Sequence, residues 1–332
     1  MKIIIPMAGM GKRMRPHTLT TPKPLIRLAG KSIVEHLIDR ISQAVEEPID
    51  EIAFITGHFG QKTEHDLRQA AKNIGAKASI YYQEEALGTA HAILCAAPSL
   101  QGPLTVAFAD TLFYSSCKLD TTQDSVIWTK HVEDPSAFGV VTTDASSRIT
   151  GFVEKPKTPV SNLAIIGIYF FKDGENLRNE LQFLIDNNVR KGNEYQLTDA
   201  LQNMMEKGLH FYSAPVDEWL DCGNKQATVQ THARVLEHQG NYVDKGAEVR
   251  QSVIVPPCYI APGAHIENSV VGPYVTVDAG SRIENAVVAD SIIQKDARIC
   301  DTVLHHSMIG NEACVTTAAR NLNLGDFSGM EA

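Results

Sequence analysis

The sequence predicts an α/β fold with a largely parallel sheet, followed by a short β-helix. Two observations lead to this prediction. Up to about residue 236, short strand-like runs alternate with longer helix-like segments, which is typical of a parallel sheet covered on both faces. From about residue 245 the helical pattern ends, and aliphatic residues recur at a short, regular period that is typical of a hexapeptide β-helix.

Each element of the first region follows from its local pattern. Short apolar runs predict strands over 2–5, 52–56, 78–82, 104–108, 125–130, 138–142, 149–153 and 164–170. The longer segments between them predict helices over 32–45, 60–74, 88–97, 174–187, 196–206 and 224–237. A chain of 332 residues is long for one domain. We therefore expect a first domain over 1–240, a repeat domain over 245–320 and a tail over 321–332.

The repeat region is defined by aliphatic residues spaced five or six positions apart. They are Ile254, Ile260, Ile266, Val271, Val277, Ile283, Val288, Ile293, Ile299, Leu304, Ile309 and Val315. Between them lie turn residues, as in Gly272-Pro273, so each short strand would contribute one inward residue per face of a coil. A run of ordinary hairpins is the alternative. At about eighteen residues per coil, the region would form about four coils. Leu322, Leu324 and Phe327 of the tail could cap it.

Composition limits the class of protein. A hydrophobic content of 43% is ample for packed cores, and a net charge of −9 argues against a nucleic-acid-binding protein. The six cysteines include no Cys-x-x-Cys pair, which indicates neither a zinc site nor a disulfide framework and favours a reduced, cytoplasmic compartment. The first apolar run, Ile3 to Ile5, is too short for a signal peptide. No run approaches the ~20 apolar residues of a membrane span, so we expect no membrane partner.

The most informative segment is the loop that follows the first strand. Ile3 to Ile5 run into a glycine-containing loop and then into cations: Lys12, Arg13, Arg15 and, soon after, Lys23. A loop that leaves a strand, exposes backbone N–H groups and carries positive charge is suited to a polyphosphate. The strand places this loop at the carboxyl edge of the sheet, where open α/β folds bind ligands.

Known phosphate-loop motifs narrow the interpretation. A P-loop is excluded because Arg13 follows Gly11-Lys12 where Ser or Thr is needed. A dinucleotide fingerprint is disfavoured because Met14 stands where its third glycine should be. A surface turn with scattered basic residues is the structural alternative. The pattern that fits is Gly9-x-Gly11-x-Arg13-Met14-x-Pro16 followed by Pro22-Lys23-Pro24-Leu25, which resembles the signature of the sugar-1-phosphate nucleotidyltransferases (NDP-sugar pyrophosphorylases).

The resemblance implies a Rossmann-like, mostly parallel sheet of the nucleotide-diphospho-sugar transferase type and a left-handed β-helix. In such enzymes a sugar-1-phosphate oxygen attacks the α-phosphorus of a nucleoside triphosphate and pyrophosphate leaves. The protein must align two polyanions and offset their charge, which calls for cations, a divalent metal and carboxylates. By resemblance, Arg13 and Lys23 act on the triphosphate and the transition state. Ala8, Gly9, Gly11 and Lys12 complete the nucleotide loop.

Two aspartates are the expected Mg²⁺ ligands. Asp110 ends the apolar run 105–109, so it would lie at the carboxyl end of a strand. Asp221 lies in Trp219-Leu220-Asp221-Cys222-Gly223-Asn224. Both resemble the metal-binding aspartates of the family, although Ala109 replaces the usual glycine and Cys222-Gly-Asn replaces the common Thr-Gly-Thr. Each aspartate alone could instead be a strand-end cap or a turn residue.

Further segments resemble the substrate-binding parts of the family. The Gln83 amide would read the base edge, and Gly88 and Thr89 would lie against the nucleotide. Glu154 would accept hydrogen bonds from sugar hydroxyls, Lys155 would hold the sugar's phosphate, and Gly139 would allow close backbone contact. Asn162 and Gly167 are assigned to the same sugar-phosphate site, and the segment from Glu194 to Asp199 would lie near it.

The predicted function is Mg²⁺-dependent nucleotidyl transfer to a sugar-1-phosphate by a homo-oligomer. The Gln83-x-x-x-Leu87-Gly88 segment most resembles thymidylyl- and uridylyltransferases, so dTTP or UTP is expected with glucose-1-phosphate. A mannose-1-phosphate guanylyltransferase using GTP is the rival within the class. A catalytically silent regulatory or scaffold subunit is the rival from another class. It is disfavoured because such relatives typically lose a metal Asp or a phosphate cation, and this sequence keeps both kinds of residue. A third possibility, acyl transfer by the β-helix, is disfavoured because the repeat has no inserted loop to supply a catalytic His.

Overall fold

The computed structural model describes residues 1–156, 158 and 160–317, and divides into two compact units. The first comprises Met1–Ile26 and Lys31–Ala227, and the second comprises Arg27–Gly30 and the chain from Thr228 onward. Over the described part of the chain, no helix combines the length and the apolar character needed to cross a bilayer. The expected tail, 321–332, with Leu322, Leu324 and Phe327, lies outside the described residues.

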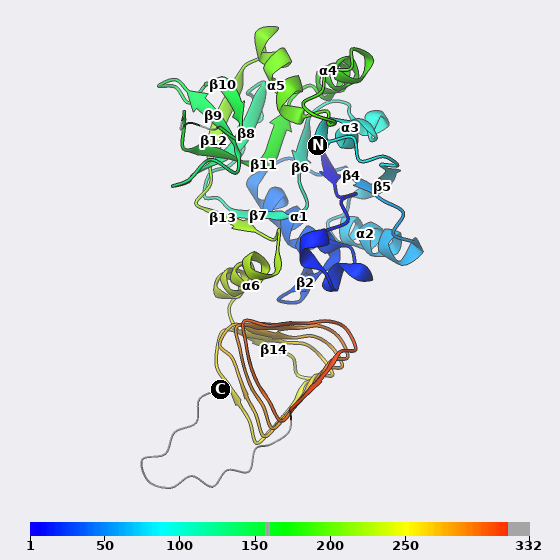
Figure 1. Cartoon of the computed structure of the whole chain (residues 1–332), viewed down its shortest axis with the longest axis vertical. Helices are drawn as coiled ribbons and strands as arrows, with labels where there is room; N and C mark the ends of the chain where they lie inside the picture. Colours follow the sequence, from blue (N-terminus) through cyan, green and yellow to red (C-terminus); the bar gives the residue numbers. More distant parts are fainter. Residues whose placement is uncertain (157, 159, 318–332) are drawn as a thin grey trace. The chain divides into compact units, whose positions relative to one another are not determined.

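The first unit is built on a nine-stranded sheet (Figure 1). Its strands are β1 (Lys2–Pro6), β4 (Glu51–Thr56), β5 (Lys77–Tyr82), β6 (Leu104–Ala107), β8 (Ser125–His131), β9 (Gly139–Thr143), β10 (Ile149–Glu154), β11 (Leu163–Phe171) and β12 (Phe211–Pro215). The helices of this unit are α1 (Ile33–Ala44), α2 (Gln61–Asn73), α3 (Thr89–Leu94), α4 (Gly174–Asp186) and α5 (Leu197–Glu206), and α6 (Lys225–Gln239) belongs mostly to the second unit. Short strands β3 (Lys31–Ser32), β7 (Thr111–Tyr114) and β13 (Glu218–Asp221) lie outside the main sheet, and β2 (Arg27–Leu28) belongs to the second unit.

A parallel core lies at the centre of this sheet, in the order β6-β1-β4-β5. Its residues are buried on both sides, because helices cover both faces. Ile4, Ala53 and Val106 join one cluster with apolar residues of α3, α4 and α5. Their neighbours along the strands, such as Ile3 and Phe54, are also fully buried and point to the opposite face, since side chains alternate along a strand. The predicted α/β fold is confirmed.

An antiparallel extension completes the sheet. Strand β11 pairs antiparallel with β6, β8 and β9, and β10 pairs antiparallel with β9. The eight strands expected from the sequence are all present. Strands β2, β3, β7, β12 and β13 were not predicted: β2 and β3 have two residues each, β7 and β13 have four, and β12 combines a short run with half-buried, mixed residues. Pairing with distant partners, rather than local pattern, stabilises β7, β12 and β13.

Helix starts follow local capping chemistry. Ser32 caps α1: its hydroxyl accepts from the Glu35 backbone N–H, and the Glu35 carboxylate accepts from the Ser32 N–H at 2.8 Å. Asp173 caps α4 by accepting from the Asn176 N–H at 2.9 Å. Both arrangements satisfy backbone donors that the first turn of a helix leaves without partners.

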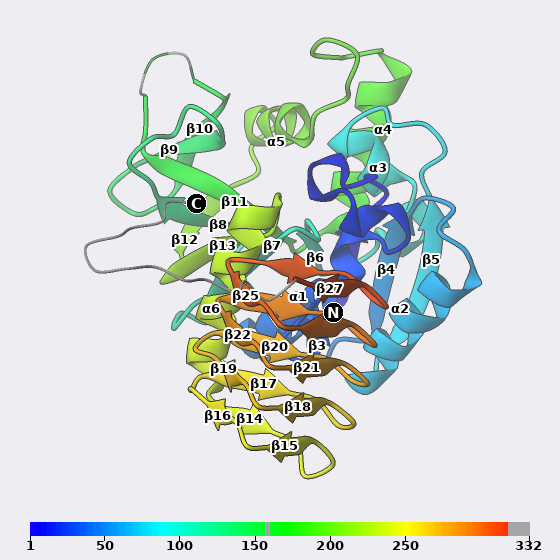
Figure 2. The same ribbon diagram turned by 60° about the horizontal axis from the view of Figure 1, so that its bottom comes forward.

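The second unit contains the left-handed β-helix, whose triangular cross-section is visible in Figure 1. Three parallel sheets form its sides, in the orders β14-β17-β20-β23-β26, β15-β18-β21-β24-β27 and β16-β19-β22-β25, and Figure 2 shows the coils stacked. The strands are β14 (Tyr242–Val243), β15 (Glu248–Arg250), β16 (Val253–Ile254), β17 (Cys258–Ile260), β18 (His265–Glu267), β19 (Val270–Val271), β20 (Val275–Val277), β21 (Arg282–Glu284), β22 (Val287–Ala289), β23 (Ser291–Ile293), β24 (Arg298–Cys300), β25 (Val303–His305), β26 (Met308–Ile309) and β27 (Cys314–Thr316).

The aliphatic repeat forms the core of the coil, as predicted. All twelve aliphatic residues of the repeat belong to, or pack against, one apolar cluster. Registers such as Ile266↔Ile283↔Ile299 stack these side chains directly above one another. The short segment Arg27–Gly30 also joins this unit: Asp278 accepts from Arg27 Nε at 3.0 Å, and the Ala29 N–H donates to Thr276 Oγ1 at 3.1 Å.

We predict that Ile283→Ala will destabilise the second unit, because Ile283 is fully buried in the middle of a stacked ladder. Removing such a side chain costs about 2–5 kcal/mol in free energy of unfolding. Val287→Ala is the matched control, because Val287 belongs to the same coil but is 44% exposed, and it should cost less than about 1 kcal/mol. Urea unfolding followed by circular dichroism measures both. Equal losses would contradict the inward assignment.

Candidate active site

The phosphate-loop candidate follows β1 directly. Gly11 adopts the left-handed conformation (φ 56°) and starts a short 3-10 turn, Lys12–Met14. Met14 is fully buried, whereas Lys12 and Arg13 are exposed. Thr18 Oγ1 donates to the Gly11 carbonyl at 2.9 Å, which holds the loop at this glycine. The buried methionine therefore anchors the turn and leaves the two cations beside it open to solvent.

Lys23 and Asp110 form the central charged pair. Lys23 Nζ lies 2.7 Å from Asp110 Oδ2. The lysine side chain is only 12% exposed, whereas the aspartate is 39% exposed. Asp110 follows β6 at the carboxyl edge of the parallel core, where the sequence analysis placed it. An incoming anion or cation can therefore reach both members of the pair.

Asp221 is brought next to Asp110 by two short strands. Strands β13 and β7 pair antiparallel with Asp221 opposite Thr111, and the Cys222 N–H donates to the Asp110 carbonyl at 2.9 Å. Arg13 reaches the same place: a Cβ placed on Gly223 would lie 2.9 Å from Asp221 Oδ1 and 3.3 Å from Arg13 Nη2. The expected triphosphate cation and the second expected metal ligand thus lie side by side.

The carboxylates fit a divalent metal ion by their chemistry. Asp110 and Asp221 come from neighbouring strands, present carboxylate oxygens and are accessible to solvent. Oxygen ligands of this kind suit Mg²⁺ and similar hard cations, which keep several waters and bind through one or two carboxylates plus substrate phosphates. Lys23 would then exchange its contact with Asp110 for one with a phosphate.

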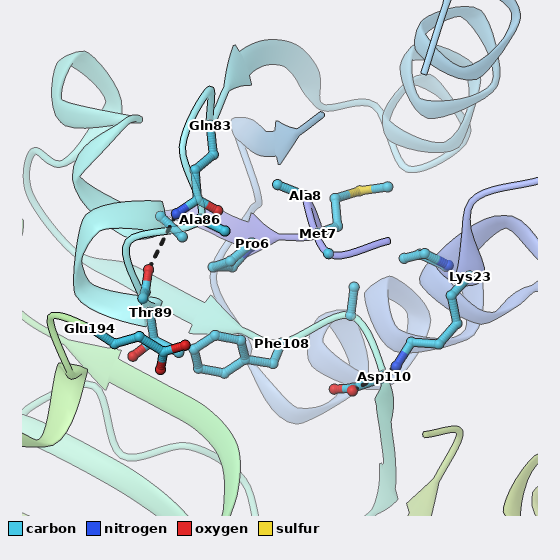
Figure 3. Close-up of a pocket in the computed structure, with 15 residues that line it drawn as sticks. Pro6, Met7, Ala8, Lys23, Gln83, Ala86, Thr89, Phe108, Asp110 and Glu194 are labelled. Atoms are coloured by element: carbon cyan, nitrogen blue, oxygen red, sulfur yellow. Dashed lines mark hydrogen bonds and ion pairs between the residues drawn. The ribbon is translucent and has the colours of Figure 1, made fainter. Parts of the chain in front are cut away.

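A cavity of about 300 Å³ opens between the phosphate loop and the loop after β5. Figure 3 shows Lys23 and Asp110 meeting at one end, with Gln83 and Glu194 toward the other. Its lining residues are Pro6, Met7, Ala8, Gly9, Lys23, Pro24, Gln83, Ala86, Gly88, Thr89, Ala92, Phe108, Ala109, Asp110 and Glu194. The cavity therefore has charged side chains at both ends, Lys23 and Asp110 at one and Glu194 toward the other, and its lining also includes apolar residues such as Phe108.

The Gln83 side chain is oriented by its neighbours. Gln83 Nε2 lies 3.3 Å from the Gly88 carbonyl and 3.1 Å from His91 Nδ1. Burial lowers the pKa of His91 below its ordinary value, and the nearby Glu85 opposes this only in part. A neutral His91 can accept through Nδ1. Both Nε2 hydrogens then have acceptors, and Oε1 of Gln83 stays available as a hydrogen-bond acceptor.

Gly88 is fixed by close backbone packing. It has φ 104°, and a Cβ at this position would lie 2.5 Å from the Tyr195 carbonyl oxygen. The contact is reinforced on both sides: Ala90 N–H donates to the Tyr195 carbonyl at 3.0 Å, and Thr89 Oγ1 accepts from the Leu197 N–H at 3.0 Å. This packing joins the loop after β5 to the segment before α5.

A second cavity of about 180 Å³ adjoins the first, because Thr89 and Phe108 line both. The remaining lining residues are Gly139, Glu154, Ile165, Gly167, Tyr169, Gln196, Leu197 and Thr198. A Cβ on Gly139 would lie 3.1 Å from Glu154 Oε2, so glycine leaves this carboxylate accessible. Tyr169 is buried, and burial together with the nearby Glu154 charge raises its pKa, so its hydroxyl stays protonated.

The structure gathers most of the expected residues but not all. Ala8, Gly9, Lys23, Gln83, Gly88, Thr89 and Asp110 line the first cavity, and Gly139, Glu154 and Gly167 line the second. Lys155 is exposed and 3.9 Å from Glu154 through Nζ. Asn162 precedes β11, where its carbonyl accepts from Val132 N–H. Gly11, Lys12, Arg13, Lys155, Asn162 and Asp221 line neither cavity.

Sequence reasoning missed several lining residues. Phe108 and Tyr169 belong to no motif that the sequence analysis used, whereas Ala86 and Thr198 lie within the segments 83–88 and 194–199, which it assigned to substrate binding. Tertiary structure brings Phe108 and Tyr169 to the cavities: Phe108 follows β6, and its N–H donates to the Gly167 carbonyl at 3.0 Å. Only the position of Phe108 at the carboxyl end of a predicted strand could have indicated it.

Comparison with known families accounts for both units. The nucleotidyl transferase family matches residues 2–238, and the GlmU-like, C-terminal hexapeptide family matches residues 224–300. The relatives include the bifunctional protein GlmU of Methanococcus maripaludis, 32% identical over 68% of this chain and 52% of the relative. The glucose-1-phosphate thymidylyltransferase of Streptomyces antibioticus is 30% identical over 71% of this chain and 67% of the relative.

Other relatives differ in substrate. The catalytic subunit beta of mannose-1-phosphate guanylyltransferase from Danio rerio is 33% identical over 52% of this chain and 49% of that protein. The matches span about half to two thirds of the length of these curated relatives. Among solved structures, a UDP-glucose pyrophosphorylase complexed with UDP-glucose aligns with a TM-score of 0.59 at 24% identity, covering 71% of this chain and 98% of that one, which shows the fold. The chain belongs to the nucleotidyl transferase family, in the sugar-1-phosphate group, and carries a GlmU-like hexapeptide β-helix.

Proposed function

We propose that this protein transfers a nucleotidyl group from dTTP or UTP to a sugar-1-phosphate, most favourably glucose-1-phosphate, and releases pyrophosphate. The observation that carries the proposal is the pair of adjoining cavities, one bounded by the phosphate loop, Lys23 and Gln83, the other by Glu154 and Gly139. Thr89 and Phe108 line both cavities, so two substrates, one in each cavity, would lie next to each other at these residues. Aligning two anionic substrates is the main catalytic task in this reaction.

The charged groups have two different electrostatic roles. Arg13 and Lys23 offset the negative charge of the triphosphate and of the departing pyrophosphate, so they stabilise charge that develops in the transition state. Asp110 and Asp221 hold a divalent cation, which we propose is Mg²⁺. When bound, that ion polarises phosphate oxygens and neutralises charge. Lys12 adds a further cation at the loop, and Gly9 and Gly11 leave backbone donors accessible.

Gln83 favours bases that present a ring N–H donor at the edge it contacts. Its Nε2 hydrogens are directed to Gly88 and His91, so Oε1 acts as the acceptor. Thymine and uracil present an N3–H donor at the matching edge, whereas the N3 of cytosine is an acceptor that would face Oε1 unfavourably. Guanine presents an N1–H donor, which the same oxygen accepts. This supports mannose-1-phosphate guanylyl transfer as the second candidate function.

The second cavity suits a sugar. Glu154 accepts hydrogen bonds from hydroxyls, and the protonated Tyr169 supplies polar character at its wall. Gly139 and Gly167 leave room for close approach of the ring. Lys155 follows β10 and Asn162 precedes β11, and both are proposed to hold the sugar's phosphate. The β-helix is proposed to be structural and to support a homo-oligomer. A row of exposed valines supports this role: Val253, Val270, Val287 and Val303, which are 38–73% exposed.

The test is pyrophosphate release measured with Mg²⁺ across a grid of substrates. It combines dTTP, UTP, GTP, CTP and ATP with glucose-, N-acetylglucosamine-, mannose- and galactose-1-phosphate. Turnover with dTTP or UTP and glucose-1-phosphate supports the proposal. Turnover with GTP and mannose-1-phosphate keeps the reaction and changes the specificity. Silence across the grid from folded protein would favour the regulatory-subunit alternative.

We predict that Asp110→Asn and Asp221→Asn will each lower kcat with Mg²⁺ at least about 100-fold, because each loses a charged metal ligand. The fold should be unchanged, since both side chains are accessible. Asp66→Asn on α2 is the matched control, because Asp66 is exposed and lines neither cavity. Near-normal turnover in either site variant would disprove the metal assignment.

We predict a pH dependence in nucleotide binding that arises from His91. Because burial lowers its pKa, His91 stays neutral at pH values at which an ordinary histidine is already partly protonated. At still lower pH it becomes protonated, Nδ1 becomes a donor, and Gln83 loses the acceptor that orients it. The KM for the nucleoside triphosphate should therefore stay constant from neutral pH into the mildly acidic range and rise on further acidification.

His91→Gln should abolish this rise, because no group at that position titrates. His17→Gln is the control. Burial also lowers the pKa of His17, but His17 lies in the turn after the phosphate loop and not beside Gln83, so this variant should keep the rise in KM. A KM that rises equally with acid in wild type and His91→Gln would rule out this orientation of Gln83.

A further inference from the structure

A cluster of two histidines and an aspartate lies on the outside of the β-helix and includes no residue that the proposed function uses. Ala289 of β22 pairs in register with His305 of β25. The following residues, Asp290 and His306, therefore occupy the same corner on consecutive coils. Both adopt the left-handed conformation, with φ of 45° and 51°. The coil repeat stacks two potential metal ligands and places His305 beside them.

The three side chains are close enough to share one ion. His305 Nε2 lies 2.8 Å from Asp290 Oδ2. The rings of His305 and His306 have centroids 4.3 Å apart, with planes at 38°. One ligand atom from each of the three residues lies within 4.8 Å of the other two. A tetrahedral ion at about 2.1 Å from its ligands holds them about 3.4 Å apart, so small side-chain rotations suffice.

Hydrogen bonds hold the backbone beneath the cluster in place. The Asp290 N–H donates to the Pro273 carbonyl at 3.0 Å, and the Ser307 N–H donates to Ser291 Oγ at 3.1 Å. The first bond ties the corner to the preceding coil, and the second joins the two coils that carry the ligands. Ligands on such a rigid element lose less conformational entropy when an ion binds. His305 is 61% exposed and Asp290 is 22% exposed at the side chain, so an ion can enter from solvent.

The ligand types determine which ion fits. Imidazole nitrogens suit zinc, nickel and copper, whereas Mg²⁺ prefers an all-oxygen environment and keeps its waters. Asp110 and Asp221 offer carboxylates alone. The two sites therefore differ in ligand type. Mg²⁺ can occupy the carboxylates while a zinc-type ion binds the histidine cluster.

We propose that Asp290, His305 and His306 form a binding site for a divalent transition-metal ion of the zinc type, separate from the nucleotidyl-transfer site. The three protein ligands leave at least one coordination position for water or an outside ligand. Because the site uses residues that the catalytic proposal leaves unassigned, it does not depend on the nucleotidyltransferase activity.

The test is a zinc titration of the chelator-treated full-length chain, with excess Mg²⁺ present to occupy carboxylate sites. Isothermal titration calorimetry should detect one saturable Zn²⁺ site per chain. His306→Gln and Asp290→Asn should each weaken it at least about tenfold, because each removes one ligand. Zn²⁺ should raise the Tm of the wild-type chain and not of the His306→Gln chain, since an ion that binds the folded state stabilises it.

His265→Gln is the matched control. His265 belongs to the same β-helix, and it contacts Glu248 and Glu267 at 3.3 Å instead of a second histidine. Its removal should leave zinc affinity unchanged. The proposal is overturned if wild type shows no saturable zinc site under excess Mg²⁺, or if His306→Gln and His265→Gln lower affinity equally. Circular dichroism checks that all variants are folded.

Discussion

The parallel pairing of β1 with both β4 and β6 is the constraint on which the candidate site depends. Lys2 is opposite Glu51 on one side and Leu104 on the other. Because the three strands share one direction, their carboxyl ends meet at one edge of the sheet. The phosphate loop after β1 and Asp110 after β6 therefore come together, and Lys23 can reach the aspartate. Burial of Ile3, Ile4 and Ile5 on both faces fixes this alignment, since a shift in register would expose apolar surface.

A second, local constraint shapes the substrate wall. The close approach of Gly88 to Tyr195 joins two segments more than a hundred residues apart in the chain. It positions Thr89 between the two cavities and directs the Gly88 carbonyl toward Gln83. A side chain at position 88 would collide with backbone atoms, which cannot rotate away. The two adjoining cavities thus share a wall whose geometry is set by backbone atoms and by the absence of a Cβ.

In the β-helix, the residues that provide stability are different from the residues that form the outer surface. Its inward ladders are uniformly aliphatic, and each coil contacts only its neighbours, so stability accumulates from one coil to the next. The corner positions contribute little to this core. They are free to carry unlike residues, and the same repeat that stacks Ile266, Ile283 and Ile299 inside also stacks Asp290 and His306 outside. A strict repeat thereby produces a ligand cluster from residues that have no motif in the sequence.

The sequence by itself determined the elements of the parallel core, the inward residues of the β-helix and the candidate residues on the phosphate loop. These follow from local periodicity, glycine placement and charge, which act over a few residues. Tertiary structure alone decided the pairing of β7 with β13, which places Asp221 beside Asp110, and the contact of Gln83 with His91 that exposes its oxygen. It also placed Phe108 and Tyr169 in the cavities and His305 beside Asp290. Such contacts join residues far apart in the chain, and their energy comes from packing and hydrogen bonds that exist only once the sheets have formed.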